Sequence, residues 1–135
     1  MVIQVGGARG TLMFCLFNKE AIMGITHVTT QVYDLQKTNK PFEAEFLVDT
    51  GSIDCMAPGD ELEKAGIQRE GKSVYELANG EIVEYEIGFA RIAFMGQETV
   101  GQVIFAPEGV ESILGVVVLE NLGFSVDPMS RKLIR

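Results

Sequence analysis

One short segment of the 135-residue chain combines residue types that could perform chemistry. It reads Asp49-Thr50-Gly51-Ser52 and follows two apolar residues. A carboxylate that acts as a general base needs a water-poor site and a fixed direction, and a tight turn after a buried strand supplies both. Gly51 permits the sharp turn, and the hydroxyls of Thr50 and Ser52 can donate to the loop or to the carboxylate. The segment therefore predicts a catalytic Asp49 supported by Thr50, Gly51 and Ser52.

The structural alternative for this segment is an Asx turn in which Asp49 only caps the chain. The surrounding sequence favours the catalytic interpretation over that alternative. Two apolar residues lead into the turn, and a second segment of two apolar residues and a glycine, Ile113-Leu114-Gly115, comes later in the chain.

The elements that must position this turn are predicted to be mostly strands. Apolar and polar residues alternate from Phe42 and become fully apolar at Val48, which is typical of a strand that enters a core. Asn79-Gly80 is a strong signal for a β-hairpin, and Met95-Gly96 marks a second bend. Strands are expected at Ile25–Tyr33, Phe42–Val48, Ser73–Leu77, Glu81–Tyr85, Phe89–Phe94, Thr99–Phe105, Phe124–Asp127 and around Lys132–Ile134.

Two short helices and a faint internal repeat accompany these strands. One helix is expected to begin at Pro58 and to end at Gly66, and the other spans Val118–Leu122 and ends at Gly123. Leu62–Ile67 is similar to Leu119–Phe124, and each copy follows an apolar strand and a glycine turn. Either two common glycine caps or a duplicated strand–turn–helix half explains this repeat.

Composition excludes several classes of function. The hydrophobic content of 47% predicts one folded domain with a real core. A net charge of −8 argues against nucleic acid and against an anionic membrane surface as partners. No apolar run is long enough to span a bilayer, and a cytoplasmic location is expected.

The few histidines and cysteines limit the chemistry further. With His27 as the one histidine and Cys15 and Cys55 as the two cysteines, no zinc site and no other metal or cofactor is expected. A Cys–His nucleophile would have only His27 as its base. Cys55 is therefore interpreted as a small buried hydrophobic residue, and His27 as a surface or interface residue.

The order and spacing of these parts resemble the retropepsin-like aspartic proteases (clan AA), in particular their small bacterial single-domain members. The resemblance rests on Val48-Asp49-Thr50-Gly51-Ser52, the hairpin over Asn79-Gly80, and Ile113-Leu114-Gly115 followed by a short helix. It covers the chain from Gly24 onward. It implies an all-β fold, namely a small closed acid-protease-type β-barrel with one or two short helices and an internal pseudo-two-fold.

The resemblance also implies an activity, the hydrolysis of peptide bonds in peptide or protein substrates. That mechanism needs two carboxylates, and the chain carries one Asp-Thr-Gly, so Asp49 from each subunit of a homodimer would form the catalytic pair. Ala78, Asn79 and Gly80 would form the tip of a flap over the substrate. Asp54 would hold the substrate backbone, or would be a solvated loop acid.

The chain departs from this family at three points. Cys55 stands where relatives usually carry Ser or Thr, the flap tip has one glycine, and residues 1–22 match nothing. The two parts are therefore an extra N-terminal segment, 1–22, and a protease-like domain, 23–135. The segment is expected to be an upstream leader, loosely docked or disordered, because the Lys19-Glu20 codons can spell a ribosome-binding sequence ahead of a start at Met23.

Two further expectations concern function and assembly. A Ser52 hydroxyl that donates to Asp49 favours the ionised carboxylate, which predicts an acidic activity optimum. The terminal strands, Ile25–Tyr33 and Phe124–Arg135, are interpreted as edge strands that could form the dimer interface.

The alternative functions are a non-catalytic dimeric β-barrel module that binds extended peptides by strand pairing, and a domain that works only inside a larger oligomer.

Overall fold

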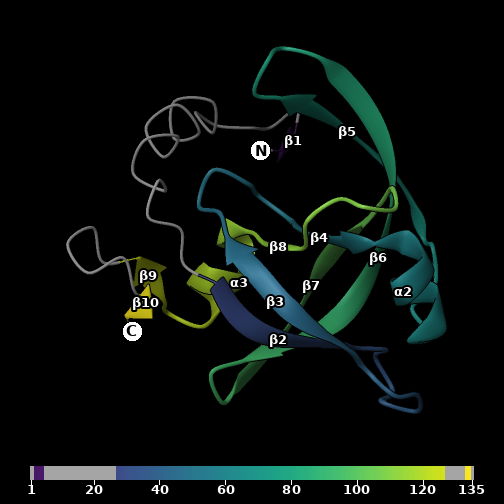
Figure 1. The fold of residues 1–135 in the computed structure, drawn as a ribbon, viewed down its shortest axis with the longest axis vertical. Coiled ribbons are helices and arrows are strands. Elements are labelled where there is room, and N and C mark those ends of the chain that lie inside the picture. The colour runs from purple at the N-terminus through teal and green to yellow at the C-terminus, as the bar shows by residue number, and fades with distance from the viewer. Residues whose placement is uncertain (1, 5–26, 127–132, 135) are drawn as a thin grey trace.

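A closed β-barrel forms the centre of the molecule. The computed structural model describes residues 2–4, 27–126 and 133–134. This part of the chain is mostly β-structure, with a six-stranded barrel and two short helices (Figure 1). The all-β barrel expected from the sequence is therefore confirmed. The elements are β1 (Val2–Gln4), β2 (His27–Tyr33), β3 (Phe42–Val48), β4 (Cys55–Pro58), α2 (Gly59–Lys64), β5 (Gly71–Leu77), β6 (Ile82–Phe94), β7 (Gln97–Ala106), β8 (Ile113–Leu114), α3 (Val116–Asn121), β9 (Ser125–Val126) and β10 (Leu133–Ile134).

The barrel closes because β6 and β7 pair with each other as well as with the two ends of the strand series. The order around the ring is β6-β2-β3-β8-β4-β7, and β7 returns to β6. The pairs β3–β8 and β4–β7 are parallel, whereas β2–β3, β2–β6 and β6–β7 are antiparallel. β5 continues the sheet outside the ring, next to β6, and β1 pairs with β5. β9 and β10 pair in a separate two-stranded sheet.

Two apolar cores lie on opposite faces of the barrel strands, because successive side chains of a strand point to opposite faces. Val48 and Leu114 belong to the barrel core, which fills the ring. Their neighbours Leu47 and Ile113 belong to a second cluster, here called the hairpin core, which Tyr75 of β5 also joins. The hairpin formed by β5 and β6 therefore packs against the outer face of β3 and β8, and in Figure 1 it arches above the loop that joins β3 to β4.

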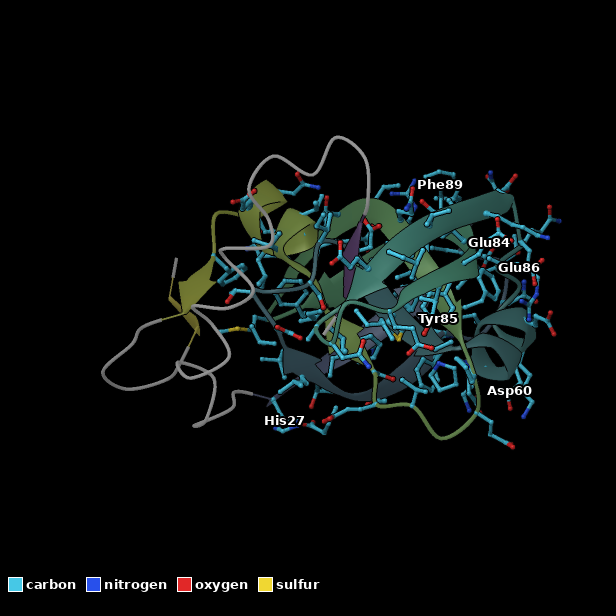
Figure 2. The ribbon with its side chains drawn as sticks, turned by 90° about the horizontal axis from the view of Figure 1, so that it is seen from above. His27, Asp60, Glu84, Tyr85, Glu86 and Phe89 are labelled. Carbon is cyan, nitrogen blue, oxygen red and sulfur yellow. The ribbon has the colours of Figure 1, made fainter. Side chains whose placement is uncertain are left out.

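β6 contributes to both cores and is one strand, where the sequence predicted two. Val83 and Tyr85 pack in the hairpin core, and Ala90 and Ile92 pack in the barrel core. Figure 2 shows Glu84 toward the edge of the molecule and Tyr85 nearer its middle. The prediction of separate strands at Glu81–Tyr85 and Phe89–Phe94 is therefore wrong. Between them, Glu86 pairs with Lys72 of β5, and Ile87 and Gly88 pair with Ile104 and Val103 of β7.

Other boundaries also differ from the expectation. β4 was not predicted, because a four-residue strand that ends in Pro58 has no clear pattern and its partners β7 and β8 are remote in sequence. α3 begins at Val116 rather than at Val118. β2 is flanked by β3 and β6, so the interpretation of β2 as an edge strand is wrong. The expectations for Cys15 and for most of residues 1–22 fall outside the described residues.

The two helices end in the same way, as the internal repeat predicts. The amide of Ile67 donates to the carbonyl of Leu62, and the amide of Phe124 donates to the carbonyl of Leu119. Gly66 and Gly123 adopt positive φ angles of 85° and 78° in these turns. These bonds form a Schellman-type helix end, in which glycine avoids the strain that a Cβ atom would cause.

The continuity of β6 generates a prediction about Gly88. A Cβ atom at this position would overlap the carbonyl oxygen of Gln68 and lie 3.0 Å from Cε1 of Phe105. Overpacking of this kind costs about 1–3 kcal/mol, so Gly88→Ala should lower the urea midpoint of unfolding clearly. Gly71→Ala is the matched control, because a Cβ atom there meets nothing within 4 Å. Equal midpoints for the two variants would contradict this account of β6.

Candidate active site

Asp49 sits at the carboxyl end of β3, where strand pairing fixes its backbone. Val48 pairs with Leu114 of β8 in parallel register. The amide of Asp49 then donates to the carbonyl of Leu114 at 3.1 Å. Only 2% of the Asp49 surface is exposed. The β3–β8 pair therefore delivers a carboxylate into a water-poor site from a rigid strand, as the sequence predicts.

Each oxygen of the Asp49 carboxylate accepts a hydrogen bond from its own turn. The amide of Gly51 donates to Oδ1 at 2.9 Å, and the hydroxyl of Ser52 donates to Oδ2 at 3.3 Å. The amide of Ser52 also donates to the Asp49 carbonyl at 3.0 Å, and Thr50 between them is half-buried. The predicted contact from Ser52 to Asp49 is confirmed. The Asx turn is present too, but a carboxylate can accept about four hydrogen bonds, so the turn does not exhaust its capacity.

The segment after the turn is held by the start of α3. The amide of Val116 donates to the carbonyl of Ser52 at 2.7 Å, and the amide of Val117 donates to the carbonyl of Ile53 at 3.2 Å. Gly115 makes this contact possible, because a Cβ atom there would lie 2.5 Å from the backbone of Ile53 and Asp54. The Ile113-Leu114-Gly115 segment therefore supports the Asp49 loop through backbone contacts.

Asp54 is a buried residue with two side-chain partners. It is 8% exposed, and its Oδ2 accepts hydrogen bonds from the hydroxyl of Tyr75 at 2.8 Å and from Nε2 of Gln102 at 2.9 Å. The alternative of a solvated loop acid is therefore wrong. Burial raises the pKa of Asp54, and the hydrogen bonds from Tyr75 and Gln102 oppose that rise. The sequence analysis did not predict either partner. One signal was available, because Tyr75 lies in an expected strand and the hydroxyl of a buried tyrosine needs a hydrogen-bond partner.

The expected flap residues form the tip of the β5–β6 hairpin. Ala78, Asn79 and Gly80 are all exposed, and Gly80 has a φ angle of 90°. The side chain of Asn79 accepts a hydrogen bond from the amide of Glu81 at 2.9 Å, which closes the turn. The structure brings Asp49, Thr50, Gly51 and Ser52 together in one turn, places Asp54 beside the hairpin through Tyr75, and leaves the tip in solvent.

Cys55 and His27 lie where the sequence suggested. Cys55 is 1% exposed, its sulfur accepts a hydrogen bond from the amide of Gly115, and burial raises its pKa to about 12. Such a thiol holds its proton at neutral pH and is a poor nucleophile. His27 is exposed and contacts the Glu111 carboxylate at 2.9 Å. Within the described ranges, no group of three or more His, Cys, Asp or Glu residues could hold a metal ion.

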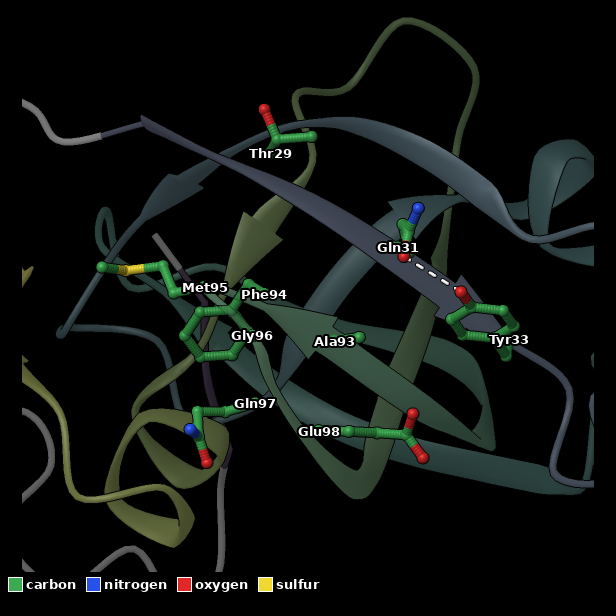
Figure 3. Close-up of a pocket in the computed structure, with 9 residues that line it drawn as sticks. All are labelled: Thr29, Gln31, Tyr33, Ala93, Phe94, Met95, Gly96, Gln97 and Glu98. Atoms are coloured by element: carbon green, nitrogen blue, oxygen red, sulfur yellow. Dashed lines mark hydrogen bonds between the residues drawn. The ribbon is translucent and has the colours of Figure 1, made fainter.

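A separate surface pocket of about 330 Å³ lies at the other end of β6 (Figure 3). Thr29, Gln31 and Tyr33 of β2 line one side, and the turn at Met95 lines the other. The hydroxyl of Tyr33 donates to Oε1 of Gln31 at 3.0 Å within it. None of its lining residues belongs to the Asp49 loop, so the pocket is distinct from the candidate active site.

The burial of Asp54 predicts a pH-dependent stability. The folded chain holds the Asp54 proton to a higher pH than the unfolded chain, whose carboxyl has an ordinary pKa of 3.8. Its contribution is complete below that value and is lost as pH rises through the folded pKa. Asp54→Asn can accept the same two hydrogen bonds through its amide oxygen and cannot ionise. The variant should therefore gain stability relative to the wild type as pH rises from about 3 toward neutrality.

Urea unfolding of the two proteins at a series of pH values measures this difference. Parallel curves of unfolding free energy against pH would contradict the assignment of Asp54 as a buried carboxyl with a raised pKa.

Comparisons with known proteins do not assign the chain to a family. No protein-family model matches the chain, and a search of curated proteins gave no match. Among the described residues, no helix has the length and apolar character needed to cross a membrane. The features that bear on function are therefore the Asp49 turn, its supporting contacts and the hairpin that packs on β3 and β8.

Proposed function

We propose that the chain is an aspartic endopeptidase whose active site forms between two copies of Asp49 in a homodimer. The observation that carries the proposal is the fixed carboxylate. Asp49 ends a core strand, is 2% exposed, and receives a hydrogen bond on each oxygen from Gly51 and Ser52. The hairpin that packs over the outer face of β3 and β8 supplies a cover for an extended substrate.

The chemistry follows from two carboxylates at hydrogen-bond distance. They cannot both ionise, so they share one proton. The ionised carboxylate takes a proton from the attacking water, and the neutral one polarises the peptide carbonyl and then protonates the leaving nitrogen. We expect the proposed enzyme to have an acidic optimum. The reaction uses no metal and no cofactor.

A two-fold dimer follows from the presence of one Asp-Thr-Gly in each chain. The sheet formed by β9 and β10 is a suitable place for part of the interface. It is paired only within itself among the described residues, so its outer edges can bond to the same strands of a second copy.

The first test replaces Asp49 by Asn. The amide oxygen can still accept from the Gly51 amide, so the fold should be retained, whereas loss of the charge should lower peptide cleavage by at least about a thousandfold. Digestion of a denatured protein at acidic pH measures the activity, and thermal unfolding checks the fold. Asp60→Asn, at an exposed position in α2, is the matched control and should cleave at the wild-type rate. Undiminished cleavage by Asp49→Asn would overturn the proposal.

The second test uses concentration. If both Asp49 residues are needed, specific activity should fall on dilution at the concentration where sedimentation shows the dimer dissociating, because the monomer holds half of the site. Specific activity that stays constant while the dimer dissociates would contradict the shared site.

A second candidate function, peptide binding by strand pairing without cleavage, is favoured by one observation. β1 pairs antiparallel with β5, with Val2 opposite Leu77 and Gln4 opposite Tyr75. The outer edge of β5 therefore accepts an extended segment, here the chain's own β1, and a bound peptide would take the place of β1. Binding of a labelled peptide that the wild type leaves intact, with equal affinity for Asp49→Asn, would favour this function over the enzyme.

A further inference from the structure

A buried polar cluster connects the hairpin to the Asp49 loop. It consists of Asp54, Tyr75 and Gln102, here called the 54–75–102 cluster. Nε2 of Gln102 bonds both to Oδ2 of Asp54 at 2.9 Å and to the Tyr75 hydroxyl at 3.1 Å, and the Tyr75 hydroxyl donates to the same Oδ2 at 2.8 Å. The three groups thus form a closed triangle of hydrogen bonds. Tyr75 is fully buried, and Asp54 is 8% exposed.

The three residues come from three different parts of the chain. Asp54 ends the loop that begins at Asp49, Tyr75 lies in β5 of the hairpin, and Gln102 lies in β7 of the barrel. The loop is already held on its other side by the backbone of Gly115 and Val116. The cluster therefore completes the clamp on the loop and fixes it to the hairpin.

The cluster also anchors the hairpin close to its tip. Tyr75 lies three residues before Ala78, the first residue of the tip, and its ring packs against the Tyr85 ring of β6 with centroids 6.0 Å apart. Both strands of the hairpin thus meet at this point, whereas the tip residues are exposed. The hairpin is therefore anchored three residues before an exposed tip, and we expect the anchor to affect the position of that tip.

We propose that Asp54, Tyr75 and Gln102 are positioning residues that hold the hairpin and the Asp49 loop in the relative orientation needed for cleavage. This inference rests on the proposed function for its catalytic consequence, and on the hydrogen-bond geometry for its structural part. None of the three side chains reacts. Asp54 acts as the shared acceptor, and Tyr75 and Gln102 act as donors from the two neighbouring strands.

The central experiment compares Tyr75→Phe with Tyr33→Phe. Each change removes one tyrosine hydroxyl and keeps the ring, but the Tyr33 hydroxyl donates to Gln31 on its own strand β2 and does not connect two elements among the described residues. Peptide cleavage is assayed well below the unfolding temperature of the protein. Tyr75→Phe should lower kcat by about tenfold, which corresponds to 1.36 kcal/mol, and should change KM less. Tyr33→Phe should cleave at the wild-type rate. Equal kcat values for the two variants would overturn the catalytic part.

Two variants of Asp54 separate hydrogen bonding from packing. Asp54→Asn keeps an acceptor for both donors, and Asp54→Leu keeps the size and loses the acceptor. The asparagine variant should retain more of the wild-type kcat than the leucine variant. Equal losses, measured on protein shown to be folded by circular dichroism, would contradict a role through the shared acceptor.

Hydrogen exchange tests the structural part without any activity. Amides of the β5–β6 hairpin should exchange faster in Tyr75→Phe than in the wild type, whereas amides of β2 and β3 should not change. Unchanged exchange in the hairpin would overturn the inference even if the protein is a protease. If the wild type cleaves no peptide but the hairpin loosens as expected, the proposed function fails and the anchoring role stands.

Discussion

The parallel pairing of β3 with β8 is the constraint on which the candidate site depends. It aligns Val48 with Leu114, and the next amide, that of Asp49, bonds to the Leu114 carbonyl. The chain then turns sharply at Gly51, and its following residues run under Gly115 so closely that no Cβ atom fits there. Two segments that lie more than sixty residues apart in sequence thereby hold one carboxylate in place. Without that pairing, Asp49 would sit in an ordinary surface loop.

The same strands also carry the outer apolar face on which the β5–β6 hairpin packs. Because side chains alternate, the strands that close the barrel core present a second apolar face outward, and the β5–β6 hairpin covers it. β6 makes this possible by extending unbroken from one core to the other. The result is a buried carboxylate at the end of a barrel strand whose outer face is covered by a hairpin with an exposed tip.

Local sequence patterns predicted the turn and the ends of the helices well. Asp49-Thr50-Gly51-Ser52 forms the expected hydrogen bonds, and Gly66 ends α2 as its position suggested. Predictions failed where contacts between residues distant in sequence determine the local structure. β4 exists because β7 and β8 flank it, and the partners of Asp54 lie 21 and 48 residues away. No local pattern reveals such contacts, since each depends on how the barrel closes.

The central claim is that two Asp49 carboxylates face each other across a two-fold axis. A crystal structure of the wild-type protein, grown at a concentration at which sedimentation shows a dimer, tests this most directly. The account predicts that the carboxylate oxygens of the two Asp49 residues lie within hydrogen-bond distance, about 2.6–3.2 Å. A dimer in which the two carboxylates are separated by a barrel, or a protein that is monomeric at all concentrations, would contradict it.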